Sequence, residues 1–218
     1  MEALATDRLT VPAGAAPGGL ALVQELVNTA SRPAAEASHI PDQLADEASG
    51  TRWLTAALRQ WAEATGQPAP SPVLGKADLA PLRKLRETVR ALASPAADGP
   101  TPQIPQIPQT PPVTASVALH LDPDGRIAYG TGATGWRAVT ALVATEILLA
   151  QRTGQWERFK ACPYAQCGIA FFDHTRNNNR VWHDVRICGN RTNLSASRQR
   201  RRDSSEAADA AGVTTPAP

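Results

Sequence analysis

Residues 162–191 read CPYAQCGIAFFDHTRNNNRVWHDVRICGNR, and this stretch holds all three cysteines of the 218-residue chain. Four candidate metal ligands fall in two pairs within it: four residues separate Cys162 from Cys167, and four separate His183 from Cys188. Three thiolates and one imidazole are the ligands that a closed tetrahedral zinc site requires. The spacing therefore predicts one zinc ion. Four protein ligands leave no open position for a catalytic water, so its predicted role is structural.

The other interpretation of these residues is three unconnected buried cysteines beside a surface histidine. That interpretation leaves unexplained why every cysteine lies in one short stretch. His174 is the rival imidazole, but it lies in a predicted turn and ranks below His183 as a ligand. A strand over 169–172, joined by Trp182, is expected to form a small hydrophobic cluster beneath the metal. Gly189 permits a close backbone approach beside the last ligand.

Residues 158–202 are too few to bury a sufficient core of their own, so zinc should supply on the order of 10 kcal/mol of their folding free energy. This segment is also strongly basic. Ten Lys and Arg against Asp173 and Asp184 give it a net charge of +8 in a chain whose total is +2, so the other residues carry −6. It is therefore predicted to attract a polyanion, and the alternative is a solvated tail with non-specific affinity. The arginines beyond the last ligand are Arg191, Arg198, Arg200, Arg201 and Arg202.

The residues that precede this segment have the apolar periodicity of helices. Predicted helices cover 20–29, 46–64, 76–92 and 136–152, and alternation around the turn DPDG at 122–125 predicts one β-hairpin over 113–129. Asp78 is expected to cap the third helix. The last helix has apolar positions over more than half of its circumference, which predicts a place at the centre of the core.

Residues 94–112 hold seven prolines, which favour extended polyproline II. We interpret them as a surface loop, and a ligand for a proline-recognising partner is the other interpretation. Residues 1–17 and 203–218 are predicted to be flexible or disordered tails. No apolar run is long enough to span a membrane, and the first residues lack the features of a secretory signal. An odd number of cysteines also argues against a framework of disulfide bonds, so these features together favour the reducing cytoplasm.

Residues 171–177 (FFDHTRN), 180–183 (RVWH) and 188–191 (CGNR) resemble the CGNR zinc finger of bacterial proteins described as stress-induced transcription regulators. The usual run of that finger is close to F-x-D-x-S-R-N, R-x-W-C and C-G-N-R, followed by a basic tail. Residues 22–29 (LVQELVNT) resemble the opening L-x-L-D-x-V-N-T of the ABATE domain of the same proteins, and DQL at 42–44 followed by Trp53-Leu54 fits its next helix. The chain departs from these patterns at His183, where the family has its third cysteine, and at Glu25, where it has aspartate.

The resemblance marks six further motif residues. We interpret the two asparagines among them as loop scaffold through side-chain-to-backbone hydrogen bonds, and direct DNA contact is the alternative. Asp173 is expected to orient a metal ligand or to pair with Arg176. Nucleic-acid contacts are assigned instead to the five arginines beyond the last ligand; Ser195, Arg198 and Arg202 share a face if 193–202 is a helix. The six motif residues are Asp173, Arg176, Asn177, Trp182, Gly189 and Asn190.

We therefore expect an α+β fold, mainly α: a helical N-terminal domain with one β-hairpin over 18–155, then a small treble-clef-like zinc finger with a basic helix over 156–202. The predicted function is a cytoplasmic, nucleoid-associated transcription regulator whose finger binds DNA. Its N-terminal domain would sense a small-molecule effector or form a homodimer. A zinc-stabilised adaptor for protein or RNA is the alternative.

An enzyme is not expected from this sequence. The N-terminal domain shows no nucleophile–base pair, phosphate loop or carboxylate pair, so we name no catalytic residues. Its few polar residues on apolar helices, Gln24, Glu25 and Asn28, are interpreted as buried hydrogen-bonding groups.

Overall fold

The computed structural model describes residues 14–30, 41–71, 73–94, 113–165, 167–195, 197, 198, 200 and 204. They belong to two compact units, residues 1–183 and 184–218. The proline-rich segment lies outside the described residues except for its first position, and the C-terminal tail lies outside them except for position 204. The predictions for these two segments therefore stay predictions.

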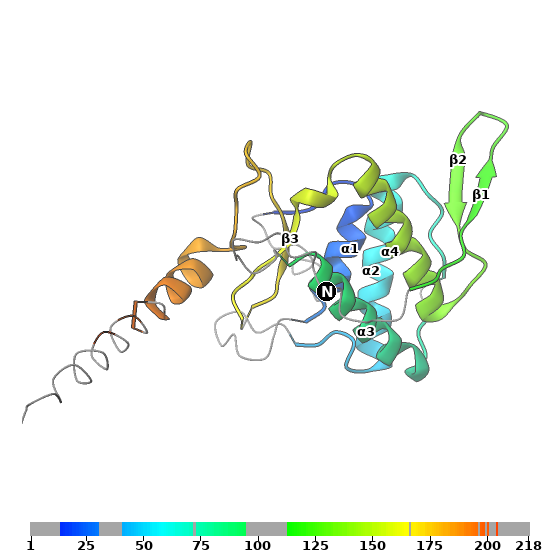
Figure 1. Ribbon diagram of the computed structural model, residues 1–218. Coiled ribbons are helices and arrows are strands. Elements are labelled where there is room, and N and C mark those ends of the chain that lie inside the picture. The colour runs from blue at the N-terminus through cyan, green and yellow to red at the C-terminus, as the bar shows by residue number, and fades with distance from the viewer. Residues whose placement is uncertain are drawn as a thin grey trace, which may run out of the picture. The chain divides into compact units, whose positions relative to one another are not determined.

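The described part of the first unit contains four α-helices, two small β-hairpins and one short 3-10 turn, which confirms the predicted α+β, mainly helical fold (Figure 1). Among the described residues, no helix is both long and apolar enough to cross a membrane. The elements are α1 (Leu20–Val27), α2 (Glu47–Thr65), α3 (Lys76–Leu92), β1 (Ala118–Leu121), β2 (Ile127–Gly130), α4 (Gly135–Arg152), η2 (Trp156–Arg158), β3 (Phe159–Ala161) and β4 (Ala170–Phe172).

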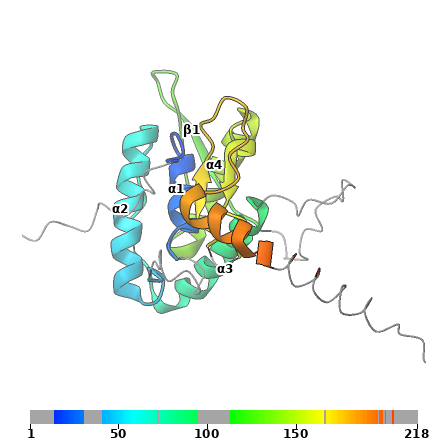
Figure 2. The ribbon, with the colours of Figure 1, turned by 90° about the vertical axis from the view of Figure 1, so that its left-hand side faces the viewer.

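The centre of the first unit is α1, the shortest of the described α-helices. Seven of its eight residues are buried, because its sequence LALVQELV presents apolar side chains in nearly every direction. It packs against α2, α3, α4 and β4, and Figure 2 shows it between α2 and α4. The last helix, α4, also belongs to this core, as predicted: it packs against α1 and α3 and contributes Val139, Leu142 and Val143 to the buried cluster, while Leu148 and Leu149 on its outer side are 56% and 44% exposed.

The helix ends follow local sequence signals. Before α2, the Asp46 carboxylate accepts a hydrogen bond from a backbone N–H of the first turn at 2.8 Å, and Gly66 ends the helix with a φ of 68°. Asp78 does not cap α3 as predicted, because the N-cap is Gly75. Asp78 instead accepts hydrogen bonds from Gly75 N at 2.8 Å and Trp136 N at 3.0 Å, which ties the start of α3 to the start of α4.

The predicted β-hairpin is formed by β1 and β2, with Leu119 opposite Tyr129 and Leu121 opposite Ile127. In Figure 1 it projects away from the helices. Tyr129 anchors it, since the phenol ring lies edge-on to Trp61 with centroids 5.9 Å apart. The hairpin is therefore attached to the core mainly at the end of β2.

A second hairpin, β3–β4, shares the helical core. Phe159 lies opposite Phe172, and Ala161 opposite Ala170; all four side chains belong to the same buried cluster as the helices. Gly14 extends this arrangement, because its carbonyl accepts a hydrogen bond from Phe172 N at 2.8 Å. Gly14 lies within the predicted flexible tail, yet it is buried and belongs to the fold.

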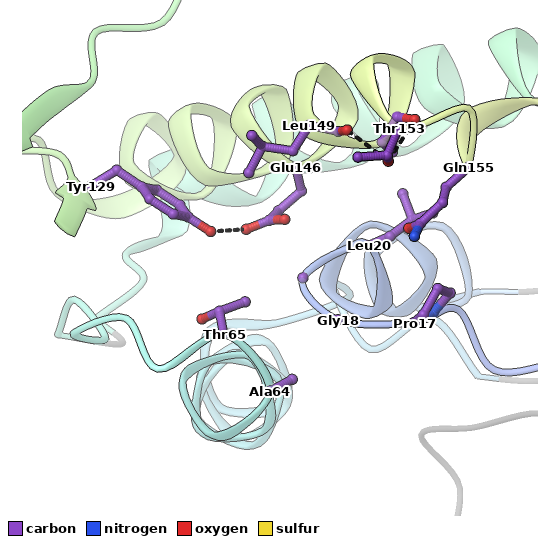
Figure 3. Close-up of a pocket in the computed structure, with 12 residues that line it drawn as sticks. Pro17, Gly18, Leu20, Ala64, Thr65, Tyr129, Glu146, Leu149, Thr153 and Gln155 are labelled. Atoms are coloured by element: carbon purple, nitrogen blue, oxygen red, sulfur yellow. Dashed lines mark hydrogen bonds between the residues drawn. The ribbon is translucent and has the colours of Figure 1, made fainter. Parts of the chain in front are cut away.

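A cavity of about 270 Å³ lies where the start of α1 and the end of α2 meet α4 (Figure 3). Its lining combines apolar side chains with a few polar groups. Glu146 of α4 and Tyr129 of β2 lie side by side in this wall, and Thr65 of α2 lies across from them.

The second unit begins with the short π-helix η3 (Val185–Gly189). Asp184 caps it, since its carboxylate accepts hydrogen bonds from Arg186 N at 2.8 Å and Ile187 N at 3.1 Å. Helical conformation continues through 190–195 and occurs at 197, 198, 200 and 204. The described part of the predicted basic helix is therefore helical.

Candidate metal centre

Two of the predicted ligands lie at the tip of the β3–β4 hairpin. Cys162 N–H donates to Ile169 O, and Cys167 N–H donates to Tyr164 O, each at 2.8 Å. Gly168 then adopts a φ of 67°, a conformation that favours glycine, and turns the chain into β4. Both thiols are 1% exposed. The Cys-x4-Cys spacing thus places two buried sulfur atoms on one tight turn.

His183 reaches the cysteines through a loop organised by Asp173. The imidazole is buried, and its Nδ1 lies 3.2 Å from Cys167 Sγ. The buried Asp173 carboxylate accepts hydrogen bonds from Lys160 Nζ and from Arg180 N, each at 2.7 Å. Burial alone would raise the pKa of Asp173, but these hydrogen bonds and two from Thr175 hold that pKa well below its usual range. The charged carboxylate therefore fixes the loop that carries the histidine.

Lys160 is the cation that the sequence prediction missed. Asp173 pairs with Lys160 and not with Arg176, which is exposed. Lys160 Nζ also donates to the carbonyl oxygens of Asn178 at 2.8 Å and Arg180 at 3.0 Å. The available signal was a single lysine within an otherwise apolar strand, since a buried cation needs an anionic partner nearby.

Two arginines of the basic segment are also engaged within the fold. Arg158 Nη1 donates to Asp173 O at 3.0 Å. Arg180 donates from Nε to Trp182 O at 3.0 Å and from Nη2 to His183 O, next to the metal cluster. With the lysine described above, three of the ten cations counted in this segment therefore support the loop. These hydrogen bonds leave the net charge of the segment unchanged, but they occupy donor groups of these three side chains within the fold.

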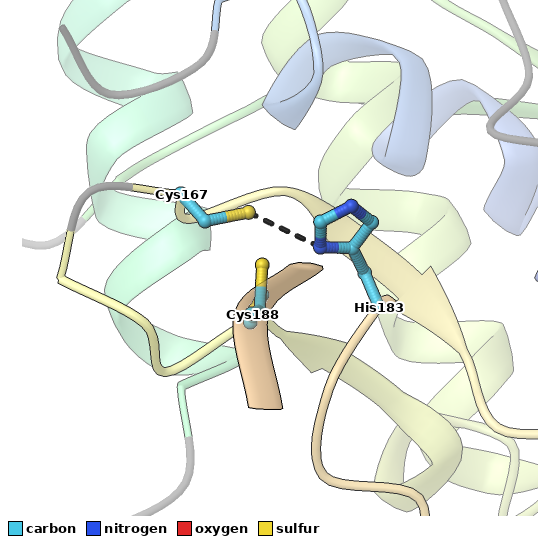
Figure 4. A group of neighbouring side chains, drawn as sticks. Cys167, His183 and Cys188 are labelled. Carbon is cyan, nitrogen blue, oxygen red and sulfur yellow. Dashed lines mark hydrogen bonds between the residues drawn. The ribbon is translucent and has the colours of Figure 1, made fainter. Parts of the chain in front are cut away.

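Cys188 of η3 is the fourth predicted ligand, and its thiol is 1% exposed. The ligand atoms of Cys162, Cys167, His183 and Cys188 all lie within 4.8 Å of one another. Figure 4 shows the last three of these side chains directed toward a common point. Atoms bound to one tetrahedral zinc ion at about 2.0–2.3 Å lie about 4 Å apart at most, so this cluster needs only small adjustments to hold the ion.

The donor chemistry agrees with zinc. A hydrogen bond with Cys167 is the largest influence on the Cys162 thiol and lowers its pKa. Burial acts in the opposite direction, but further hydrogen bonds with His183 bring the pKa of Cys162 to about 4. The thiolate is the form that binds metal. Four buried ligands, three of them sulfur, fit one structural zinc ion. The rival His174 is exposed, and its Nε2 lies 2.9 Å from Ala15 O.

The remaining motif residues differ in burial. Gly189 is buried and Trp182 is half-buried, whereas Arg176, Asn177 and Asn190 are exposed. Two amides that the sequence analysis did not single out hold the loop. Asn178 Nδ2 donates to Glu157 O at 3.0 Å, and Asn179 Oδ1 accepts from Thr175 Oγ1 at 3.1 Å. The scaffold roles of the two motif asparagines stay predictions.

The β3–β4 hairpin, which carries Cys162 and Cys167 and is called the metal hairpin below, is attached to the helices by buried polar side chains. Gln24 and Asn28 are among them, and both are buried hydrogen-bonding groups, as predicted. Asn28 Oδ1 accepts from Ala170 N at 2.8 Å, and its Nδ2 donates to Ala170 O at 3.0 Å. Gln24 Nε2 donates to the same carbonyl at 3.1 Å. Arg90, buried on α3, donates from Nε to Gly168 O at 3.0 Å. No sequence pattern distinguished this arginine from a surface cation.

Glu25 is the third polar residue of α1. It is 3% exposed, and burial raises its pKa to about 8. The chain therefore keeps a carboxyl group, with glutamate in place of aspartate, inside its central helix.

The arginines predicted to bind nucleic acid lie on and after the helical residues of the second unit. Arg191 is half-buried, and Arg198 and Arg200 are exposed. Ser195 Oγ donates to Arg191 O at 2.9 Å, one turn back along the helix. Arg201 and Arg202 lie outside the described residues.

Comparison with known families agrees with this geometry. The CGNR zinc finger matches residues 158–201, and ABATE, described as "Putative stress-induced transcription regulator", matches residues 20–153. A search of the curated proteins finds no match. Both resemblances inferred from the sequence are confirmed. The chain belongs to the ABATE family and carries a CGNR zinc finger that contains the buried Cys3His cluster.

Proposed function

We propose that the protein is a transcription regulator whose zinc finger binds duplex DNA and whose N-terminal domain senses an effector or dimerises. The observation that carries this proposal is the arginine-rich stretch beyond the last zinc ligand, which is helical in its described residues from 190 onward. Residues 189–202 contain five arginines and no acidic residue. Arg198 and Arg200 are exposed on helical backbone. Such side chains can neutralise phosphates or donate to guanine edges.

The family description supports regulation, and the buried polar residues of α1 argue against catalysis in that helix. Gln24 and Asn28 are already engaged with backbone groups. We infer that these residues hold the fold and do not act on a substrate.

The test measures the affinity of the zinc-loaded full chain for duplex DNA by fluorescence anisotropy at several salt concentrations. Each phosphate contact contributes about 0.9 to the slope of log K against log salt. Arg198→Ala and Arg200→Ala should each lower that slope by about 1, whereas Arg126→Ala, an exposed arginine in the β1–β2 turn, should leave it unchanged. Equal slopes in all four proteins would contradict the assigned contacts.

Zinc dependence is tested with Cys188→Ser, which should abolish specific binding if the finger is the binding element. Genome-wide mapping of bound sites then tests DNA binding and target together.

An adaptor that binds protein or RNA is the second candidate. It is favoured by exposed apolar side chains on the second unit, where Val185 and Leu194 are 60% and 57% exposed. Competition between duplex DNA and structured RNA at one stated salt concentration separates the candidates. Preference for RNA, or no affinity for either, would favour the adaptor.

A further inference from the structure

The cavity between α1, α2 and α4 contains a buried carboxylate (Figure 3). Glu146 is 4% exposed. Its Oε1 accepts two hydrogen bonds, from Trp61 Nε1 at 2.7 Å and from the Tyr129 hydroxyl at 2.6 Å. Burial and the neighbouring carboxylate raise the pKa of Tyr129, so this phenol stays a neutral donor. Both groups that bind Oε1 are therefore uncharged.

The second oxygen of Glu146 is not engaged in the same way. No hydrogen-bond donor among the described residues reaches Oε2, and no lysine or arginine among them forms an ion pair with Glu146. Oε2 lies against Gly19 at the start of α1, where an added Cβ would approach it to 2.0 Å. A side chain at position 19 would displace the Glu146 carboxylate, so the observed position of this carboxylate requires glycine there.

The environment leaves most of the carboxylate charge uncompensated. The N-terminus of α1 offers at most about half a positive charge, and two neutral donors offer none. Buried carboxylates are normally paired with a cation, because an unpaired buried charge is costly. A cation that paired with Oε2 would have to be small and would have to reach it from the cavity.

We propose that this cavity binds a small organic cation, an ammonium group on a short alkyl chain, that donates a hydrogen bond to Glu146 Oε2. The apolar part would lie against Leu20, Leu149 and Ala150, which line the same space. Thr153 and Gln155 supply further polar groups in the lining. A volume of about 270 Å³ lies just below the range of about 300–1,000 Å³ that is usual for ligand pockets, so the ligand is a small metabolite.

This inference deepens the sensing part of the proposed function and rests on it for its regulatory meaning. The cavity is lined by the first residue of α1, and Gln24 and Asn28 further along this helix hold the metal hairpin. A ligand at Glu146 would thus contact the helix that supports the zinc-binding turn.

The experiment measures binding of n-butylammonium to the zinc-loaded full chain by calorimetry and by thermal shift, in the absence of DNA. Neutral n-butanol and anionic butyrate serve as probes of similar size and different charge. We expect the amine to bind and raise the melting temperature, and the other two to have at least ten-fold weaker effects. Equal binding of all three, or no binding of the amine, would overturn the proposal.

Three variants locate the site. Glu146→Gln keeps an acceptor for Trp61 and Tyr129 but removes the charge, so amine affinity should fall at least ten-fold. Glu157→Gln, the same change at an exposed position outside the cavity, should bind as the wild type does.

If Glu146→Gln does not fold, Ala64→Phe decides, because Ala64 is exposed on α2 and lines the cavity. It should block the amine without disturbing the core. Wild-type affinity in Ala64→Phe or Glu146→Gln would refute the site. Since no DNA is present, either outcome leaves the DNA-binding proposal to its own test.

Discussion

The surroundings of two buried carboxyl groups shift their pKa values in opposite directions. Asp173 stays charged because Lys160 and the loop backbone donate to it. Glu25 lies inside α1, where burial raises its pKa to about 8. One carboxyl group therefore organises a loop by its charge, while the other favours the neutral form in the folded state.

The raised pKa of Glu25 predicts a pH dependence of stability. The folded-state value of about 8 lies above the ordinary value of 4.5, so the stability that the neutral group contributes is fully present below pH 4.5. It is lost as the pH rises through about 8. In Glu25→Gln the side chain stays neutral, so the unfolding free energy of the variant relative to wild type should rise by about 2 kcal/mol from about pH 6 to about pH 8.

Urea denaturation of both proteins at several pH values measures this difference. Glu63→Gln, an exposed change on α2, should show no such trend. A flat difference for Glu25→Gln would mean that the buried carboxyl is already charged in the folded protein.

At the scale of elements, the attachment of β4 to α1 depends on a few polar contacts. Asn28 makes two hydrogen bonds to the backbone of Ala170. Asn28→Ala leaves those buried backbone groups with fewer partners, which should cost about 1–3 kcal/mol of stability. Hydrogen exchange of the Ala170 amide should accelerate, whereas Asn193→Ala, an exposed change, should not affect it. Unchanged protection of that amide would show that Asn28 does not hold the strand.

Several elements could be predicted from the sequence because their signals are local. The helical periodicity of α2, the turn at Gly125 and the clustered cysteines each depend on neighbours along the chain. The four-residue metal cluster was predicted for the same reason, since ligand type and spacing are local properties.

Other features could not be predicted because they depend on distant partners. Lys160 and Arg90 look like surface cations in the sequence, yet their hydrogen bonds run to Asp173 and to Gly168. The central place of α1 follows from how four elements surround it, which its own length does not reveal. Asp78 was predicted as a cap from its position, but its second partner, Trp136 N, lies on another helix.

At the scale of the whole molecule, the first unit combines helices and metal ligands. Cys162, Cys167 and His183 all lie in it, and the β3–β4 side chains belong to the helical core. Removing zinc should therefore lower the melting temperature of the helices themselves, by several degrees for a loss of a few kcal/mol. Far-UV circular dichroism with and without a chelator measures this shift.

The control is Cys162→Ser, in which the chelator should produce little further change. If the helices of the wild type melted at the same temperature with and without zinc, the metal would stabilise only its immediate surroundings.

The contacts around β4 also bear on self-association. One edge of this strand pairs with β3, and on its other side the carboxamide of Asn28 and the carbonyl of Gly14 take the positions that a neighbouring strand would occupy. Exposed strand edges are templates for pairing with other chains. Residues far apart in the sequence thus close the edge of the metal hairpin, and they protect the protein from edge-to-edge aggregation at the segment where it binds zinc.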